Sequence, residues 1–214
     1  RLKPVAYATC ESVNQVPPPL SLDQLHRLLS VPEQNIVAGR REYTIIGLMC
    51  DTGVRLTECL SIRVADADLP YIAIRCAKMG RQREVLVSEE MGFAIGRWLE
   101  TRQDTIRDGW LAASVFLFPS RQAATLHRRT LQASIKEYAA QAGIEGVRVS
   151  PHPLRFTYAT ACVQSGMNLT RLQFRLGHST VTMSRAYVAM SDAAAHEASR
   201  LASPFRQLSD PDRG

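Results

Sequence analysis

The 214-residue chain has no long hydrophobic run and few cysteines. No stretch approaches the roughly 18 consecutive apolar residues that a membrane-spanning helix needs, and no signal-peptide pattern opens the chain, so a membrane protein is not expected. The five cysteines, at positions 10, 50, 59, 76 and 162, are scattered and form no Cys-x-x-Cys pair. They predict neither a zinc site nor a disulfide framework, but the reduced thiols of a cytosolic protein.

Acidic residues are missing from one long segment. From Arg148 to Tyr187, both included, the chain contains five arginines and no Asp or Glu. A solvated surface normally mixes both signs of charge, so this segment indicates a surface that holds an anion. The planar guanidinium group can bind phosphate oxygens through two parallel hydrogen bonds. The formal net charge of +6 and the pI of about 9.3 also favour an anionic partner, with nucleic acid the first candidate.

The rest of the composition, 45% hydrophobic and 21% charged, is that of a globular protein with one sizeable core. Residues 1–20 end in Pro17-Pro18-Pro19, so we expect an extended linker there. Apolar spacing predicts a mainly helical (α+β) domain over 21–202 with a small antiparallel β-hairpin, and a tail over 203–214. Two helices are predicted to begin at the capping residues Ser21 and Ser88. Further helices are predicted over 40–50, 56–62, 126–142, 153–165, 169–176, 181–190 and 193–201, and strands over 71–74 and 84–87.

A glycine turn between two predicted helices carries the first candidate site. It reads Thr52-Gly53-Val54-Arg55-Leu56-Thr57-Glu58. Arg55 starts a helix, where free backbone N–H groups favour an anion, and Glu58 lies three residues on, within reach of the guanidinium group. Taken alone, the segment is more typical of a capped helix with an Arg–Glu pair on its surface.

The tip of the predicted hairpin is basic. It carries Arg75, Lys78, Arg81 and Arg83 with no acid between them. Such a tip could enter a DNA groove, and a lysine there could donate a proton to a leaving oxygen. By itself, a soluble turn with ordinary surface charges is the more common origin of this pattern.

Two further motifs lie in the acid-free segment. In His152-Pro153-Leu154-Arg155 the proline suits the first turn of a helix, so His152 stands at its N-terminus and Arg155 one turn further on, facing the same pocket. Leu176-Gly177-His178 ends one predicted helix, and Tyr187 follows nine residues later on the next. A capping histidine and a packed tyrosine are each common, but a tyrosine beside a bound phosphate could attack phosphorus as a nucleophile.

In order and spacing, these segments together resemble the catalytic domain of the tyrosine recombinases, the phage-integrase family. The signature of that family is a Thr-Gly-x-Arg-x-x-Glu segment, a hairpin lysine, a His-x-Leu-Arg box, a Leu-Gly-His box and a nucleophilic tyrosine. The resemblance covers about residues 20–202. It implies a supporting role for Glu58, and the other hairpin residues, Arg75, Arg81 and Arg83, are expected to contact DNA. The implied catalytic residues are Arg55, Lys78, His152, Arg155, His178 and Tyr187.

The resemblance implies a reaction on double-stranded DNA without metal, cofactor or ATP. The two catalytic arginines would bind the non-bridging oxygens of the attacked phosphate, where charge accumulates. His178 would donate a hydrogen bond, His152 would act as an acid, base or donor, and Lys78 would protonate the leaving 5′ oxygen. Tyr187 would form a 3′-phosphotyrosine, which a second DNA 5′-hydroxyl then displaces.

Family members act as four protomers on two duplexes at a recombination site, through a Holliday junction. The helix over 193–201 is therefore expected to dock on a neighbouring protomer. The family's amino-terminal DNA-clamping domain is missing and the first residue is Arg1 rather than Met, so we expect the catalytic part of a longer chain. A bacterial cytoplasm or a phage-infected host is the expected location.

Two alternatives remain at this point. A type IB topoisomerase uses similar chemistry to relax supercoils, although the compact Leu-Gly-His box and its spacing to Tyr187 favour a recombinase. A DNA-binding module that has lost catalysis should lack at least one of the six residues. A metal-dependent nuclease would need clustered carboxylates, and these segments offer only Glu58. The motifs do not distinguish a phage integrase from a transposon recombinase or a chromosome-dimer resolvase.

Overall fold

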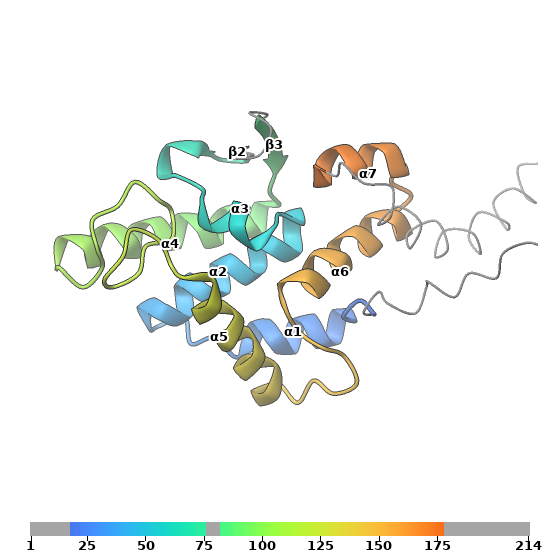
Figure 1. Cartoon of the computed structure of the whole chain (residues 1–214), viewed down its shortest axis with the longest axis horizontal. Helices are drawn as coiled ribbons and strands as arrows, with labels where there is room; N and C mark the ends of the chain where they lie inside the picture. Colours follow the sequence, from blue (N-terminus) through green and yellow to red (C-terminus); the bar gives the residue numbers. More distant parts are fainter. Residues whose placement is uncertain (1–17, 76–81, 178–214) are drawn as a thin grey trace, which may run out of the picture. The chain divides into compact units, whose positions relative to one another are not determined.

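Helix α2, Val37–Thr52, lies at the centre of the fold in the computed structural model, which describes residues 18–75 and 82–177 (Figure 1). Buried side chains lie on all sides of this helix, and Ile45, Ile46, Leu48 and Met49 have no exposed surface. A helix buried all round must be surrounded by other elements. It packs against both α4, Glu89–Arg107, and α6, Pro151–Gln164.

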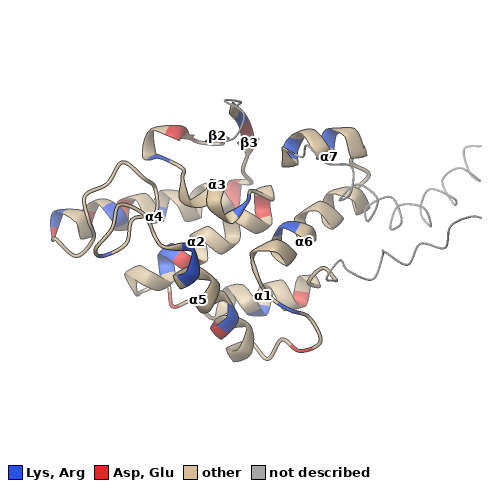
Figure 2. Cartoon of the chain, in the orientation of Figure 1, with Lys and Arg blue, Asp and Glu red and all other residues tan. Residues whose placement is uncertain are grey.

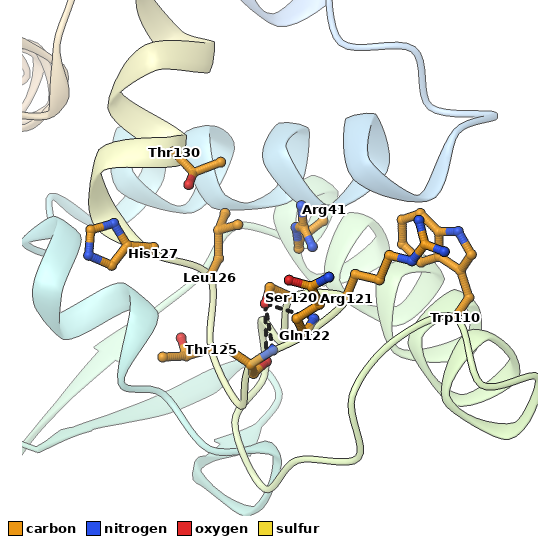
Figure 3. Close-up of a pocket in the computed structure, with 10 residues that line it drawn as sticks. Arg41, Trp110, Ser120, Arg121, Gln122, Thr125, Leu126, His127 and Thr130 are labelled. Atoms are coloured by element: carbon orange, nitrogen blue, oxygen red, sulfur yellow. Dashed lines mark hydrogen bonds between the residues drawn. The ribbon is translucent and has the colours of Figure 1, made fainter.

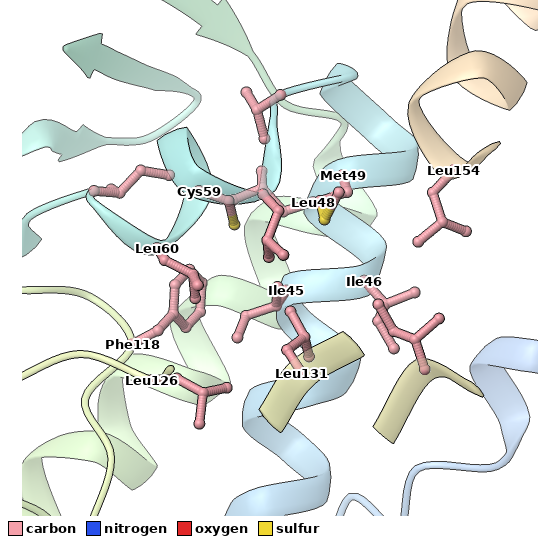
Figure 4. Packing of buried hydrophobic residues seen from close by; sticks show 14 of the residues in the cluster. Ile45, Ile46, Leu48, Met49, Cys59, Leu60, Phe118, Leu126, Leu131 and Leu154 are labelled. Atoms are coloured by element: carbon pink, nitrogen blue, oxygen red, sulfur yellow. The ribbon is translucent and has the colours of Figure 1, made fainter. Parts of the chain in front are cut away.

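The core forms where α2 meets its neighbours. In Figure 4 the apolar side chains of α2 lie beside Leu154 of α6, beside Leu131 of α5, Arg128–Gln141, and beside Cys59 of α3, Leu56–Leu60. All three of these side chains have no exposed surface. The core thus joins α3 and α6, which carry two of the motifs predicted to be catalytic, those of Arg55 and Glu58 and of His152 and Arg155.

The apolar segment 115–118 forms no regular helix or strand. Phe116 forms an isolated antiparallel bridge with Arg63, while Leu117 and Phe118 are fully buried. Trp98 of α4 donates from its indole N–H to the Leu117 carbonyl at 2.9 Å and stacks on Phe118, with 6.2 Å between ring centroids. Its apolar character therefore serves core packing rather than a sheet.

The predicted capping residues do cap their helices. Ser21 Oγ accepts from the Gln24 N–H at 3.1 Å, and Gln24 Oε1 accepts from the Ser21 N–H at 2.9 Å, a capping box at the start of α1, Leu22–Ser30. Ser88 accepts from the Met91 N–H at 3.2 Å and begins α4. Just before α1, the Leu20 N–H donates to Thr157 Oγ at 2.9 Å, so the chain is tied to α6 from Leu20 onward.

A three-stranded antiparallel sheet contains the predicted hairpin. Its order is β1, Ala67–Asp68, then β2, Tyr71–Arg75, then β3, Gln82–Leu86. The register pairs Ile72 with Val85 and Ile74 with Arg83, so Arg83 lies on the buried face of the sheet. The prediction of a mainly helical domain with a small antiparallel sheet is confirmed. Strand β1 was not predicted, because two residues are too few to show alternation.

Most helix limits differ from the predicted ones by a few residues. Helix α2 starts three residues earlier, α3 ends two residues earlier, and α6 begins at Pro151, whose missing N–H costs nothing in the first turn. Helix α7, Leu169–Leu176, has the predicted limits. The helices predicted over 181–190 and 193–201 lie outside the described residues, and the domain limits at residues 20 and 202 remain predictions.

Candidate active site

Gly53 ends α2 and turns the chain toward α3. Its φ of +66° lies in the left-handed region, and its N–H donates to the Met49 carbonyl at 3.0 Å. A Cβ at this position would lie 2.3 Å from Cδ1 of Tyr158, so both the conformation and the space require glycine. The turn places Arg55 at the N-cap of α3, as the sequence predicted.

Glu58 of α3 is the centre of a cluster of three arginines. Its Oε1 accepts from Nη1 of Arg55 and Nη1 of Arg83, both at 3.0 Å. Its Oε2 accepts from the backbone N–H of Arg55 at 2.9 Å and from Nη2 of Arg83 at 2.8 Å. Nη1 of Arg155 lies 4.0 Å from the same oxygen. Among these four side chains positive charge exceeds negative charge by two, which favours the approach of an anion.

The carboxylate of Glu58 stays ionised although it is only 7% exposed. Burial alone raises the pKa of this group, but the hydrogen bonds from Arg83 and from the Arg55 N–H, together with the charges of both arginines, outweigh burial and lower the pKa to about 2. At neutral pH Glu58 is therefore a fixed negative charge around which the guanidinium groups are arranged.

Arg155 is held by main-chain carbonyl groups. Its side chain is 4% exposed, Nη1 donates to the Gly53 carbonyl at 2.5 Å, and Nη2 donates to the Leu176 carbonyl at 2.6 Å. One acceptor lies at the end of α2 and the other at the end of α7. Because both amino groups are anchored, the plane of the guanidinium group is set before any ligand binds, as catalysis by electrostatic preorganisation requires.

The end of α7 closes the cluster. Gly177 has a φ of +62°, and its carbonyl accepts from Nη2 of Arg55 at 3.3 Å. Nε of Arg83 donates to the Arg175 carbonyl at 3.0 Å. A Cβ at position 177 would lie 2.9 Å from Nη1 of Arg83, so this glycine both ends the helix and makes room for the arginine. His178, the next residue in the chain, lies outside the described residues.

His152 lies in the first turn of α6, three residues before Arg155, and is exposed. Partial desolvation lowers its pKa, and the charge of Arg155 acts in the same direction. The imidazole is therefore mainly neutral at pH 7, a state in which one ring nitrogen can accept a proton.

The sequence matches the phage integrase family over residues 19–194. The chain belongs to this family. Among curated relatives, tyrosine recombinase XerD of Haemophilus ducreyi is 33% identical over 176 residues, which are 81% of this chain and 58% of the relative. XerD of Neisseria meningitidis is 30% identical over 173 residues, or 80% and 58% of the two chains. The chain thus spans less than two thirds of the length of these curated relatives.

Solved structures share the fold. The crystal structure of XerA recombinase matches with a TM-score of 0.73 and 29% identity, over 89% of this chain and 65% of that chain. XerH site-specific recombinase bound to palindromic difH substrate, in a post-cleavage complex, matches with a TM-score of 0.72 and 22% identity, over 87% and 53%. The mainly helical fold with its small sheet is therefore that of known tyrosine recombinase domains.

In this integrase-family chain, Arg55, Glu58, His152 and Arg155 come together from α3 and α6, as the motifs predicted. Figure 2 shows that the only charged residues along α6 and α7 are basic. Lys78, Arg81, His178 and Tyr187 lie outside the described residues, and their roles remain predictions.

The two described hairpin arginines lie on opposite faces of the sheet. Arg75, on the outer face, pairs with Asp66, with Nε 3.0 Å from both carboxylate oxygens. Arg83 was predicted to contact DNA, yet its side chain is only 10% exposed and pairs with Glu58. Every second residue of a strand shares a face, so the alternation of Arg83 with the apolar Val85 along β3 was the sequence signal for this inward orientation.

A cavity of about 260 Å³ lies elsewhere, between the start of α5 and the loop before it (Figure 3). Arg41, Trp110, Arg121 and His127 are among its lining residues. No residue predicted to be functional lines it, so the candidate active site of this integrase-family chain is the cluster around Glu58.

Proposed function

We propose that this chain is the catalytic domain of a site-specific DNA recombinase that cleaves and rejoins DNA strands through a 3′-phosphotyrosyl intermediate. The observation that carries the proposal is the convergence of Arg55 and Arg155 on one buried carboxylate, with Arg155 already oriented by two carbonyl groups. Such fixed cationic donors suit the non-bridging oxygens of an attacked phosphodiester, whose negative charge grows in the transition state.

The described residues supply the binding part of the reaction. The Arg55 side chain is 40% exposed and therefore open to an incoming phosphate, while Arg155 lies behind it at the floor of the cluster. His152, mainly neutral at pH 7, acts as an acid, base or donor near the nucleophile. In the proposed reaction Tyr187 attacks phosphorus, its phenolate forms the new P–O bond, and the 5′ oxygen leaves with a proton from Lys78. His178 donates a hydrogen bond to the phosphate.

Double-stranded DNA at a specific recombination site is the proposed substrate, and four copies of the protein act together on two duplexes. The net charge of +6 supports DNA as the partner, as does the DNA bound in the XerH complex. We place the protein in a bacterial cytoplasm or a phage-infected host, because its XerD relatives are bacterial proteins.

Trapping the covalent intermediate tests the proposed function. The probe is a suicide duplex, nicked beside the cleavage point and carrying the sequence that the protein selects from random duplex DNA. Incubation in EDTA followed by a denaturing gel should show a DNA–protein adduct with a free 5′-hydroxyl, and Tyr187→Phe should bind the same duplex without forming it. An adduct that survives Tyr187→Phe, or one that requires a divalent metal, contradicts the proposal.

A further inference from the structure

Arg83 makes more contacts within the cluster than a groove-binding arginine would. Its two Nη groups bind both oxygens of Glu58 in a bidentate pair, at 3.0 and 2.8 Å, while its Nε donates to the Arg175 carbonyl. It comes from the buried face of β3, opposite Ile74. One side chain therefore connects three elements: the hairpin, α3 and the end of α7.

From these contacts we infer that Arg83 is a positioning residue, which orients the two phosphate-binding arginines through Glu58 and the end of α7. The inference rests on the proposed function, because it concerns how the same site cleaves DNA. It replaces the expectation that Arg83 contacts DNA directly.

Arg83 orients Arg55 through the carboxylate of Glu58, which both residues contact. Nη1 of Arg83 and Nη1 of Arg55 share Oε1 of Glu58, each at 3.0 Å, so the position of this oxygen fixes both. The backbone N–H of Arg55, which donates to the other carboxylate oxygen, lies at the start of α3, only three residues from Glu58. Arg83 ties the carboxylate to β3 through two short hydrogen bonds, while Nη1 of Arg155 on α6 lies farther away, 4.0 Å from Oε2. Without Arg83, Glu58 can change rotamer and take the Arg55 guanidinium group with it.

Arg83 orients Arg155 through the last turn of α7. Arg83 holds the Arg175 carbonyl, and the carbonyl of the next residue, Leu176, accepts from Nη2 of Arg155 at 2.6 Å. A Cβ at residue 177 would lie 2.9 Å from Nη1 of Arg83, so glycine at this position lets the guanidinium group approach closely. The last turn of α7 is thus held from one side by Arg83 and itself holds Arg155.

Positioning and DNA contact predict different kinetics. A phosphate-binding arginine that is lost weakens DNA binding and reduces the salt dependence of affinity. A positioning arginine that is lost leaves affinity nearly unchanged but lowers the rate of cleavage, since misplacement of about 1 Å can cost roughly 100-fold in rate. Arg83, with its side chain 10% exposed, belongs to the second case.

The test measures single-turnover cleavage of the suicide duplex and affinity for the uncut duplex, using Arg83→Gln, Arg83→Lys, Glu58→Gln and the double variant with both glutamines. Arg107→Gln is the matched control, because it removes an equally charged, salt-bridged arginine from the exposed end of α4. All measurements are made at a temperature where circular dichroism shows each variant folded.

We expect Arg83→Gln to cleave about 100-fold more slowly than Arg107→Gln, with affinity changed by less than about threefold. Arg83→Lys keeps the charge but cannot bind two carboxylate oxygens and a carbonyl in one plane, so it should recover only part of the rate. In the Glu58→Gln background Arg83→Gln should cost clearly less than in the wild-type background, because both changes break the contact with Arg55 through Glu58, while the contact with the Arg175 carbonyl is lost only with Arg83.

Three results would overturn the inference while leaving the proposed function intact, provided that the wild type forms the adduct. The first is a normal cleavage rate for Arg83→Gln, and the second is full recovery of the cleavage rate by Arg83→Lys. The third is a double variant whose loss of rate equals the product of the two single losses. If Arg83→Gln loses affinity for the uncut duplex by the same factor as it loses cleavage rate, Arg83 contacts DNA directly. If Arg83→Gln does not fold, Arg83→Lys and its combination with Glu58→Gln decide the question by the same criteria. No adduct from the wild type would refute the proposed function, and the inference with it.

Discussion

The ionised carboxylate of Glu58 should make the folded protein sensitive to acid, and Glu58→Gln should remove that sensitivity. The arginines lower the pKa of Glu58 from 4.5 to about 2 in the folded state. Because the folded-state pKa is the lower one, the ionised group adds stability above pH 4.5, and this stability is lost as the pH falls toward 2.

The magnitude follows from the two pKa values. A difference of this size corresponds to about 3 kcal/mol of unfolding free energy at pH 7. By linkage, about 1 kcal/mol of it is lost by pH 4 and about 2 kcal/mol by pH 3. Glu58→Gln keeps the shape of the side chain but has no proton to gain, so this part of the pH dependence should be missing from the variant.

Urea unfolding at pH 7, 4 and 3, followed by circular dichroism, measures the effect. The free energy of unfolding of the wild type should fall by about 2 kcal/mol more than that of Glu58→Gln between pH 7 and pH 3. Asp104→Asn is the control, since it makes the same carboxylate-to-amide change at a side chain that is 61% exposed and pairs with Arg107 at the surface. Equal slopes for wild type and Glu58→Gln would refute the electrostatic argument for the cluster.

Three further predictions follow from the site and the charge. Arg155→Ala should slow cleavage of the suicide duplex by about 100-fold or more, because it removes a preorganised transition-state contact, and a near-normal rate would place the chemistry elsewhere. Gly53→Ala should lower the free energy of unfolding by at least about 2 kcal/mol through its φ and its contact with Tyr158, whereas Gly92→Ala, in open space on α4, should be neutral or stabilising by up to about 1 kcal/mol. Urea unfolding compares the two, and equal effects would contradict the steric reason. Affinity for duplex DNA, measured by fluorescence anisotropy, should fall at least about tenfold between 50 and 200 mM salt, and a flat response would argue against phosphate contacts.

Local features of the site were predictable from the sequence. Arg55 and Glu58 lie three residues apart at a helix start, and Gly53 and Gly177 end helices, so neighbouring residues alone determine these arrangements. Ser21 and Ser88 were recognised as caps for the same reason. The resemblance to a family then indicated that His152 and Arg155 belong with them.

Contacts between distant segments were not predictable in the same way. The sequence of the hairpin showed that Arg83 is basic, but its pairing with Glu58 depends on which face of β3 meets α3. Its near neighbour Arg75 has the same charge and faces Asp66 instead. The charge pattern alone treats the two arginines alike, and only the alternation of buried residues along the strand separates them.

The two carbonyl groups that hold Arg155 limit what mutagenesis can reveal. Gly53 and Leu176 contribute these acceptors through the main chain, so no substitution removes either oxygen. An alanine scan would register these positions only through displacement of the backbone, and would underestimate their part in catalysis. Replacing the amide by an ester, which makes the carbonyl a weaker acceptor, is the kind of change that reaches them. The anchoring of this arginine is thus encoded in the path of the chain, and many different sequences that preserve the path could preserve it.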